Sequence, residues 1–188
     1  SSPPVAWWDP SVGIAESSGA VSAWTDRTGG AIVTQASGSL RPSYSATSLN
    51  GYPGVTFDGT DDVLSLVGVP ANLPTGSDSS WIFGIVDQQA LVADTGIKVW
   101  AGYGGGSANQ ARVTERQSIS SANLAVVENG TVVSTVTTVD FSGINAVFGI
   151  FDAGTLQSRI NGTNSTPTAA TLATTTSRIR LGAYQDVA

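Results

Sequence analysis

The sequence predicts an all-β fold in which two antiparallel sheets pack as a jelly-roll sandwich. Only 12% of the residues are charged, while glycine, serine, threonine, alanine and valine are abundant. This composition favours strands and tight turns over helices. Apolar runs alternate with turn clusters at intervals of about ten to fifteen residues, which is typical of a sandwich. Two Asn-Gly pairs, Asn129-Gly130 and Asn161-Gly162, fit the two positive φ angles of a type I′ hairpin turn.

The elements follow one another along a single expected domain. Two prolines fix an extended backbone at the start, so we expect residues 1–4 to end a linker and residues 5–188 to form one domain. Residues 9–24 show no sustained helical period but could hold one short helical turn. The similar runs WIFGIVD and AVFGIFD are interpreted as two strands buried on both faces. The expected strands are residues 5–8, 31–34, 54–57, 63–67, 81–87, 97–103, 111–115, 124–128, 131–139, 146–152, 157–160 and 177–183.

Charge and residue types exclude several classes of function. The net charge is −6 and Lys98 is the one lysine, so no basic stripe can neutralise a phosphate backbone, and we expect no nucleic-acid partner. No apolar run approaches the roughly 20 residues of a membrane span, so we expect no membrane insertion. Cysteine and histidine are both absent, which removes the usual ligands of zinc, copper and iron. We expect no cofactor other than calcium, which oxygen ligands alone can bind.

Three aspartates, Asp58, Asp61 and Asp62, stand close together between two apolar runs. They fit a tight turn, in which aspartate side chains accept hydrogen bonds from nearby backbone amides. They also fit part of a calcium site, which needs about six to eight oxygens and hence carbonyls from another loop. Catalysis is a third alternative, but the glutamates are widely separated and no histidine can complete a nucleophilic triad. We therefore expect no enzymatic activity, and the turn and calcium alternatives stay open.

A second group of candidate residues surrounds a glycine-rich loop. Trp100 and Tyr103 precede the loop, and Asn109 and Arg112 follow its glycines. An aromatic ring beside hydrogen-bonding side chains is an arrangement that can hold a sugar. We therefore predict that these four residues contact a glycan, with an ordinary core position for Trp100 as the alternative. The loop is not a phosphate-binding loop, because no Lys-Ser/Thr pair and no helix follow it.

Six motifs in order resemble the concanavalin A-like lectin/glucanase superfamily. They are AWWDPS, VSAWTDRTG, RPSY, LNGYPGVTFDGTDDVLSL, RINGT and RLGAY. Within that superfamily, the chain is most similar to LamG-like jelly-roll domains of bacteriophage structural proteins and secreted bacterial proteins. The resemblance implies a concanavalin A-like jelly roll with one concave face, but no particular activity, because the fold hosts lectins, glucanases and assembly modules. The carboxylate-bearing strand motif of the glucanases is missing.

The resemblance also implies a further strand after the RLGAY segment, pairing near the N-terminal strand. We expect residues 5–8 to be completed by polypeptide beyond Ala188 or by a strand of a neighbouring subunit, because an unpaired strand edge exposes amides and carbonyls. The second arrangement would make the protein a homo-oligomer.

The leading functional hypothesis is a non-enzymatic, lectin-like module for adhesion or decoration on a phage virion or another extracellular surface. Its expected partner is a surface glycan. One alternative is a carbohydrate-binding module of a secreted polysaccharide-degrading enzyme. Another is a purely architectural capsid or tail protein, whose partners are neighbouring structural subunits.

Overall fold

The fold is nearly all β. The computed structural model describes residues 3–67, 72–87, 98–105, 111–116, 124–128, 132–136, 143–152, 154–175 and 178–182. Among them the one helical element is a 3₁₀ turn, Gly38–Leu40, and no helix is long and apolar enough to cross a membrane. Each strand pair in these ranges is antiparallel. The predicted all-β, antiparallel fold is therefore confirmed, while the jelly-roll order of the strands stays a prediction.

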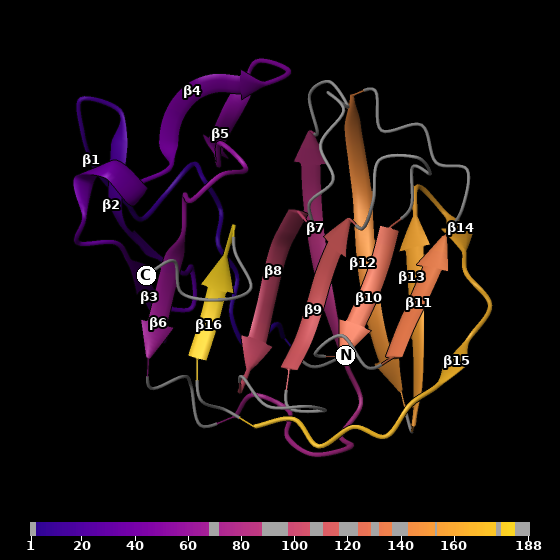
Figure 1. The fold of residues 1–188 in the computed structure, drawn as a ribbon. Coiled ribbons are helices and arrows are strands. Elements are labelled where there is room, and N and C mark those ends of the chain that lie inside the picture. Colours follow the sequence, from indigo (N-terminus) through magenta and orange to yellow (C-terminus); the bar gives the residue numbers. More distant parts are fainter. Residues whose placement is uncertain are drawn as a thin grey trace. The chain divides into compact units, whose positions relative to one another are not determined.

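The chain divides into two compact units. Unit 1 is Ser1–Leu73 with Thr176–Ala188, and unit 2 is Pro74–Thr175. The strands of unit 1 lie in the order β16-β6-β3-β2-β4-β5, and β1 also pairs with β2 (Figure 1). These strands are β1 (Ile14–Ser17), β2 (Ala20–Thr25), β3 (Ile32–Thr34), β4 (Ser43–Leu49), β5 (Tyr52–Thr56), β6 (Leu64–Val67) and β16 (Arg178–Leu181). Val21, Val33 and Leu64 are fully buried in its core.

Unit 2 is a sandwich of two antiparallel sheets, the arrangement that the sequence predicts for residues 5–188 as a whole. Its first sheet has the order β11-β10-β9-β8, and its second has the order β14-β13-β12-β7, with β15 also paired to β13. Strands β9, β10 and β11 lie against β12 and β13, and Phe151, Leu156 and Leu172 form a buried apolar cluster. The strands are β7 (Ser80–Asp87), β8 (Lys98–Gly104), β9 (Ala111–Arg116), β10 (Leu124–Glu128), β11 (Val132–Val136), β12 (Ile144–Asp152), β13 (Thr155–Ile160), β14 (Thr163–Asn164) and β15 (Thr168–Ala169).

The predicted hairpin at Asn161-Gly162 is confirmed. Both residues have positive φ angles, 46° and 90°, and they join β13 to β14 where Ile160 pairs with Thr163. The other predicted turn, at residues 129–130, lies outside the described residues, although β10 and β11 on either side of it pair antiparallel. The Asn-Gly pair at residues 161–162 therefore predicted a hairpin turn correctly.

Two hairpins of unit 1 correct the sequence analysis. The stretch that could have held a helical turn forms β1 and β2 instead, joined by Ser18 and Gly19 with φ angles of 53° and 84°. A further Asn-Gly turn, Asn50-Gly51 with φ angles of 51° and 86°, joins β4 to β5. In both turns two consecutive positive φ angles match the right-handed twist of the flanking strands.

Residues 5–8 do not form a strand, so that prediction is wrong. Side-chain contacts and one backbone hydrogen bond, from the Arg27 amide to the Trp7 carbonyl at 2.7 Å, hold this segment instead of a sheet ladder. The Trp8 indole donates a hydrogen bond to the Trp24 carbonyl at 3.1 Å, and the Trp24 indole donates to the Asp9 carbonyl at 3.3 Å. The Arg27 guanidinium forms an ion pair with the Asp9 carboxylate at 2.5 Å. With no strand at residues 5–8, the predicted need for a partner strand there loses its basis.

Candidate functional site

Among the residues of unit 2 that the structure describes, the most exposed large apolar side chains lie on one side of β7. Trp81, Phe83 and Ile85 are 57%, 45% and 48% exposed, and they alternate with less exposed residues. Alternate residues of a strand point to the same face of the sheet, so these three side chains share a face. The interpretation of WIFGIVD as a strand buried on both faces is therefore wrong.

Strand β12 extends this face. In the antiparallel register Ile150 pairs with Trp81 and Phe148 with Phe83. The Phe83 and Phe148 rings have centroids 4.5 Å apart and an interplanar angle of 37°, a spacing at which aromatic rings attract one another. Phe148 and Ile150 are half-buried, whereas the neighbouring positions along β12 are buried. We call Trp81, Phe83, Phe148 and Ile150 the aromatic face.

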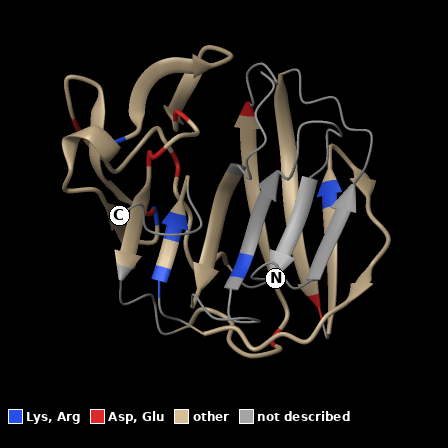
Figure 2. Cartoon of the chain, in the orientation of Figure 1, with Lys and Arg blue, Asp and Glu red and all other residues tan. Residues whose placement is uncertain are grey.

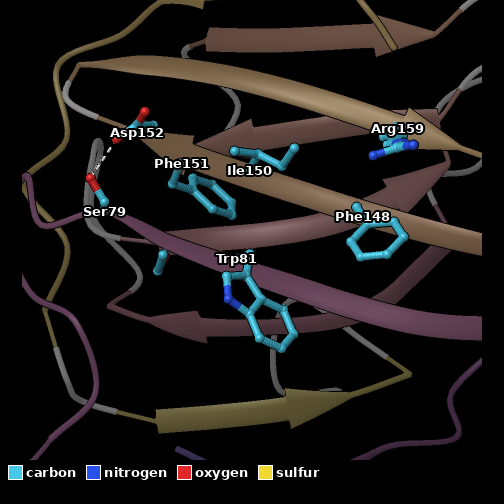
Figure 3. Close-up of a pocket in the computed structure, with 8 residues that line it drawn as sticks. Ser79, Trp81, Phe148, Ile150, Phe151, Asp152 and Arg159 are labelled. Carbon is cyan, nitrogen blue, oxygen red and sulfur yellow. Dashed lines mark hydrogen bonds between the residues drawn. The ribbon is translucent and has the colours of Figure 1, made fainter. Parts of the chain in front are cut away.

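A hollow of about 480 Å³ lies at one end of the aromatic face (Figure 3). Its lining residues are Ser79, Ser80, Trp81, Phe148, Ile150, Phe151, Asp152 and Arg159. Figure 3 shows Asp152 and Arg159 toward opposite ends, with Ile150 between them. The volume is within the usual range for ligand sites, which combine apolar walls with a few polar groups.

The polar groups of the hollow differ in what they already bind. The Ser79 hydroxyl donates a hydrogen bond to Asp152 Oδ1 at 2.6 Å, which holds that carboxylate at the end of β12. Arg159 is exposed on β13, directly opposite Phe148. Within the part of the chain that the structure describes, neither the Arg159 guanidinium nor the Trp81 indole N–H has a hydrogen-bond partner. Both donors are therefore available to a ligand.

Charge is sparse on this sheet. In β7, β12 and β13 the charged residues are Asp87, Asp152 and Arg159, and the two aspartates are the last residues of β7 and β12. Figure 2 shows that charged residues are few on these strands. Arg159 is thus the one positively charged residue of the three strands, and its cross-strand neighbour on β12 is Phe148.

The residues predicted to bind a glycan are placed differently. Tyr103 and Arg112 pair across β8 and β9, but they are 8% and 0% exposed. Trp100 is half-buried, and Asn109 lies outside the described residues. The structure therefore brings Tyr103 and Arg112 together inside unit 2, where they offer almost no surface to a glycan, and the predicted contact remains a prediction that this geometry does not support.

Arg112 and Tyr103 instead bind the protein. The Arg112 guanidinium donates to Thr174 Oγ1 at 2.9 Å, to the Gly76 carbonyl at 3.1 Å and to the Ser80 hydroxyl. The Tyr103 hydroxyl donates to the Pro74 carbonyl at 3.2 Å, and burial raises its pKa, so it keeps its proton at neutral pH. The two side chains thus have a structural role in the interior.

The aspartate group forms a turn in unit 1. Asp58 Oδ1 accepts hydrogen bonds from the amides of Thr60, Asp61 and Asp62 at 2.8, 3.2 and 3.4 Å. The Asp58 amide in turn donates to Asp62 Oδ2 at 2.9 Å. Burial raises the pKa of Asp62; the hydrogen bond from the Asp58 amide opposes this shift, and the nearby Asp58 and Asp61 carboxylates add to it. These contacts favour the turn interpretation.

Carboxylate oxygens of Asp58, Asp61 and Asp62 lie within 4.8 Å of one another. This spacing would let them share a cation, but calcium needs about six to eight oxygens. Three carboxylates cannot supply that number without other groups. The calcium hypothesis therefore stays a prediction beside the turn.

We expect Asp58→Ala to lower the free energy of unfolding by about 1 kcal/mol, because three backbone amides lose their acceptor. Asp61→Ala is the matched control, since its carboxylate accepts no hydrogen bond from another described residue. Its removal should leave stability within about 0.5 kcal/mol. Urea unfolding with and without calcium measures both effects. Equal losses for the two variants would contradict the turn role, and a calcium-dependent rise in stability that both variants abolish would establish a metal site.

Comparisons of the chain with protein-family models, curated proteins and solved structures found no match. The aromatic face and its hollow are therefore the features of the molecule that indicate a function.

Proposed function

We propose that this protein is a non-enzymatic carbohydrate-binding module, acting in adhesion or decoration on a virion or another extracellular surface, and that it binds glycans on the aromatic face. The observation that carries the proposal is the aromatic face, where exposed Trp81 and Phe83 lie with half-buried Phe148 at a hollow that has a polar group at each end. Large exposed apolar patches on soluble proteins commonly mark binding sites.

The chemistry of a sugar suits this arrangement. A pyranose ring presents C–H groups with a small positive charge on its faces and hydroxyl groups around its edge. The face of an aromatic ring carries the negative part of its quadrupole, so Trp81 and Phe148 can stack against a sugar face. Asp152 can accept hydrogen bonds from hydroxyls at one end of the hollow, while Arg159 can donate to oxygens at the other.

The composition of the hollow supports binding rather than hydrolysis. Glycoside hydrolysis normally uses two carboxyl groups that flank the scissile bond about 5 to 10 Å apart. Asp152 is the one carboxylate among the residues that line the hollow. The chain also has no histidine or cysteine to act as a base or nucleophile.

The test is glycan-array binding of the full chain and of Trp81→Ala. We expect Trp81→Ala to weaken binding about tenfold or more, because an exposed tryptophan at the centre of a contact contributes strongly to affinity. Trp7→Ala is the matched control, since Trp7 is 50% exposed but lies in unit 1. Both variants should melt close to the wild type.

Three results would contradict the proposal. The first is that the wild type binds no glycan, and the second is that the wild type and Trp81→Ala bind equally well. The third is that Trp7→Ala loses as much affinity as Trp81→Ala. Self-association that Trp81→Ala abolishes, in the absence of glycan binding, would instead favour the architectural alternative.

A further inference from the structure

We infer that the glycan bound here carries a carboxylate, on a single acidic sugar between neutral sugars, and that Arg159 binds this carboxylate. The inference rests on the proposed glycan-binding function and specifies the class of glycan. Its structural basis is the row of Phe83, Phe148 and Arg159, which are opposite one another on β7, β12 and β13.

Arg159 has no acidic cross-strand neighbour. Its cross-strand neighbours are Phe148 on one side and Asn164 on the other, and neither can balance its charge. Asp152 pairs with Thr155, four residues along the strand from Arg159, which is roughly 13 Å at the usual rise of a strand. Asp87 is at the far end of β7, opposite Ile144. No carboxylate on these strands is therefore close enough to pair with Arg159.

A ligand that covers the aromatic face would remove water from this guanidinium. A cation that loses its water opposes binding unless the ligand compensates its charge. The hydroxyl oxygens of a neutral sugar can accept hydrogen bonds from Arg159 but do not compensate its charge, whereas a carboxylate does both. A carboxylate is planar and accepts two parallel hydrogen bonds from the guanidinium fork. The adjacent Phe148 ring lowers the local polarity and strengthens this pairing.

The opposite end of the hollow sets a limit on ligand charge. Asp152, held by Ser79, would repel a second anionic group that reached it. The net charge of −6 also opposes the approach of a polyanion. The site therefore suits an isolated acidic sugar whose neutral neighbours place hydroxyls near Asp152, rather than a polyuronate or a heavily sulfated chain.

Matched pairs of oligosaccharides test the inference by calorimetric titration of the full chain. In the first pair, sialyllactose is compared with lactose. In the second pair, a xylo-oligosaccharide that bears one glucuronic acid is compared with the same oligosaccharide without it. Oligogalacturonate and a sulfated oligosaccharide serve as polyanionic probes. We expect an acidic member of at least one pair to bind about tenfold more tightly than its neutral partner, and the polyanions to bind more weakly.

Arg159→Gln should remove this preference, because the affinity for the acidic member falls to about that for its neutral partner, and Arg159→Lys should restore part of the preference. Preference for the sulfated probe would overturn the assignment of a carboxylate, and preference for oligogalacturonate would overturn the limit on charge. The neutral and acidic members could also bind equally well, with binding that Trp81→Ala weakens and Arg159→Gln leaves unchanged. This result would overturn the inference while the proposed function stands. Absence of binding to every probe and to the glycan array would overturn both.

Discussion

Arg112→Met is expected to lower the free energy of unfolding by about 3 kcal/mol, measured by urea unfolding of the full chain. Methionine approximates the length of the arginine stem but has no donor. The substitution therefore leaves the Thr174 hydroxyl, the Gly76 carbonyl and the Ser80 hydroxyl without the bonds that the guanidinium now donates. The Gly76 carbonyl keeps its bond from the Thr174 amide and the Ser80 hydroxyl keeps its bond to Tyr103. The expected loss is therefore that of hydrogen bonds to a charged donor, which contribute about 1.5 to 3 kcal/mol.

The location of these acceptors makes Arg112 important to the whole of unit 2. Gly76 and Thr174 stand near the first and last residues of the unit, and their backbones bond to each other at 2.8 and 3.3 Å. Arg112 reaches both from β9 and packs its charge over the rings of Tyr103 and Phe151, 5.9 and 5.2 Å from their centroids. The Arg112 side chain thus links residues near both ends of the unit to its core.

Two further variants identify the cause. Arg112→Lys keeps the charge, but an ammonium group cannot reach three acceptors that are arranged around a planar fork. We expect it to destabilise at least as much as Arg112→Met, because a buried charge then has fewer hydrogen bonds. Arg159→Met on the surface of the same unit should change stability by less than about 0.5 kcal/mol. An Arg112→Met protein within 1 kcal/mol of the wild type would show that the network contributes little.

Strands with a clear apolar run and a strong turn signal could be predicted from the sequence. Strands β12 and β13 and the Asn161-Gly162 turn are examples. Strand β4 was missed although Asn50-Gly51 follows it, because its residues SYSATSL are mostly polar and mostly exposed. The β1–β2 hairpin was missed because Ser18-Gly19 is a weaker turn signal than Asn-Gly.

The candidate site was harder to predict because it depends on tertiary structure. Trp81, Phe83 and Ile85 alternate with Ile82, Gly84 and Val86, so the strand shows no contrast between apolar and polar positions. Only the packed sandwich distinguishes its two faces. The interior position of Arg112 likewise depends on acceptors 32 to 62 residues away in the sequence, which no local pattern brings together.

Gly182→Ala is expected to destabilise unit 1 by about 3 kcal/mol. Gly182 follows β16 and has a φ angle of 88°, in the left-handed region that disfavours a side chain. A Cβ atom at this position would lie 2.1 Å from Phe57 Cδ1 and 2.8 Å from the Asp62 carbonyl oxygen. The ring and the aspartate turn would have to move, which adds the cost of overpacking to the cost of backbone strain.

Gly29→Ala separates these two costs. Gly29 also lies in unit 1 and has a φ angle of 75°, but a Cβ atom there would meet nothing within 4 Å. It should cost only the backbone strain of about 1 to 2 kcal/mol. Combining Gly182→Ala with Phe57→Leu should recover part of the loss, because the smaller side chain frees space beside the new methyl group. If Gly182→Ala and Gly29→Ala unfold at the same urea concentration, the close approach of Phe57 adds nothing to the cost of the Gly182 substitution.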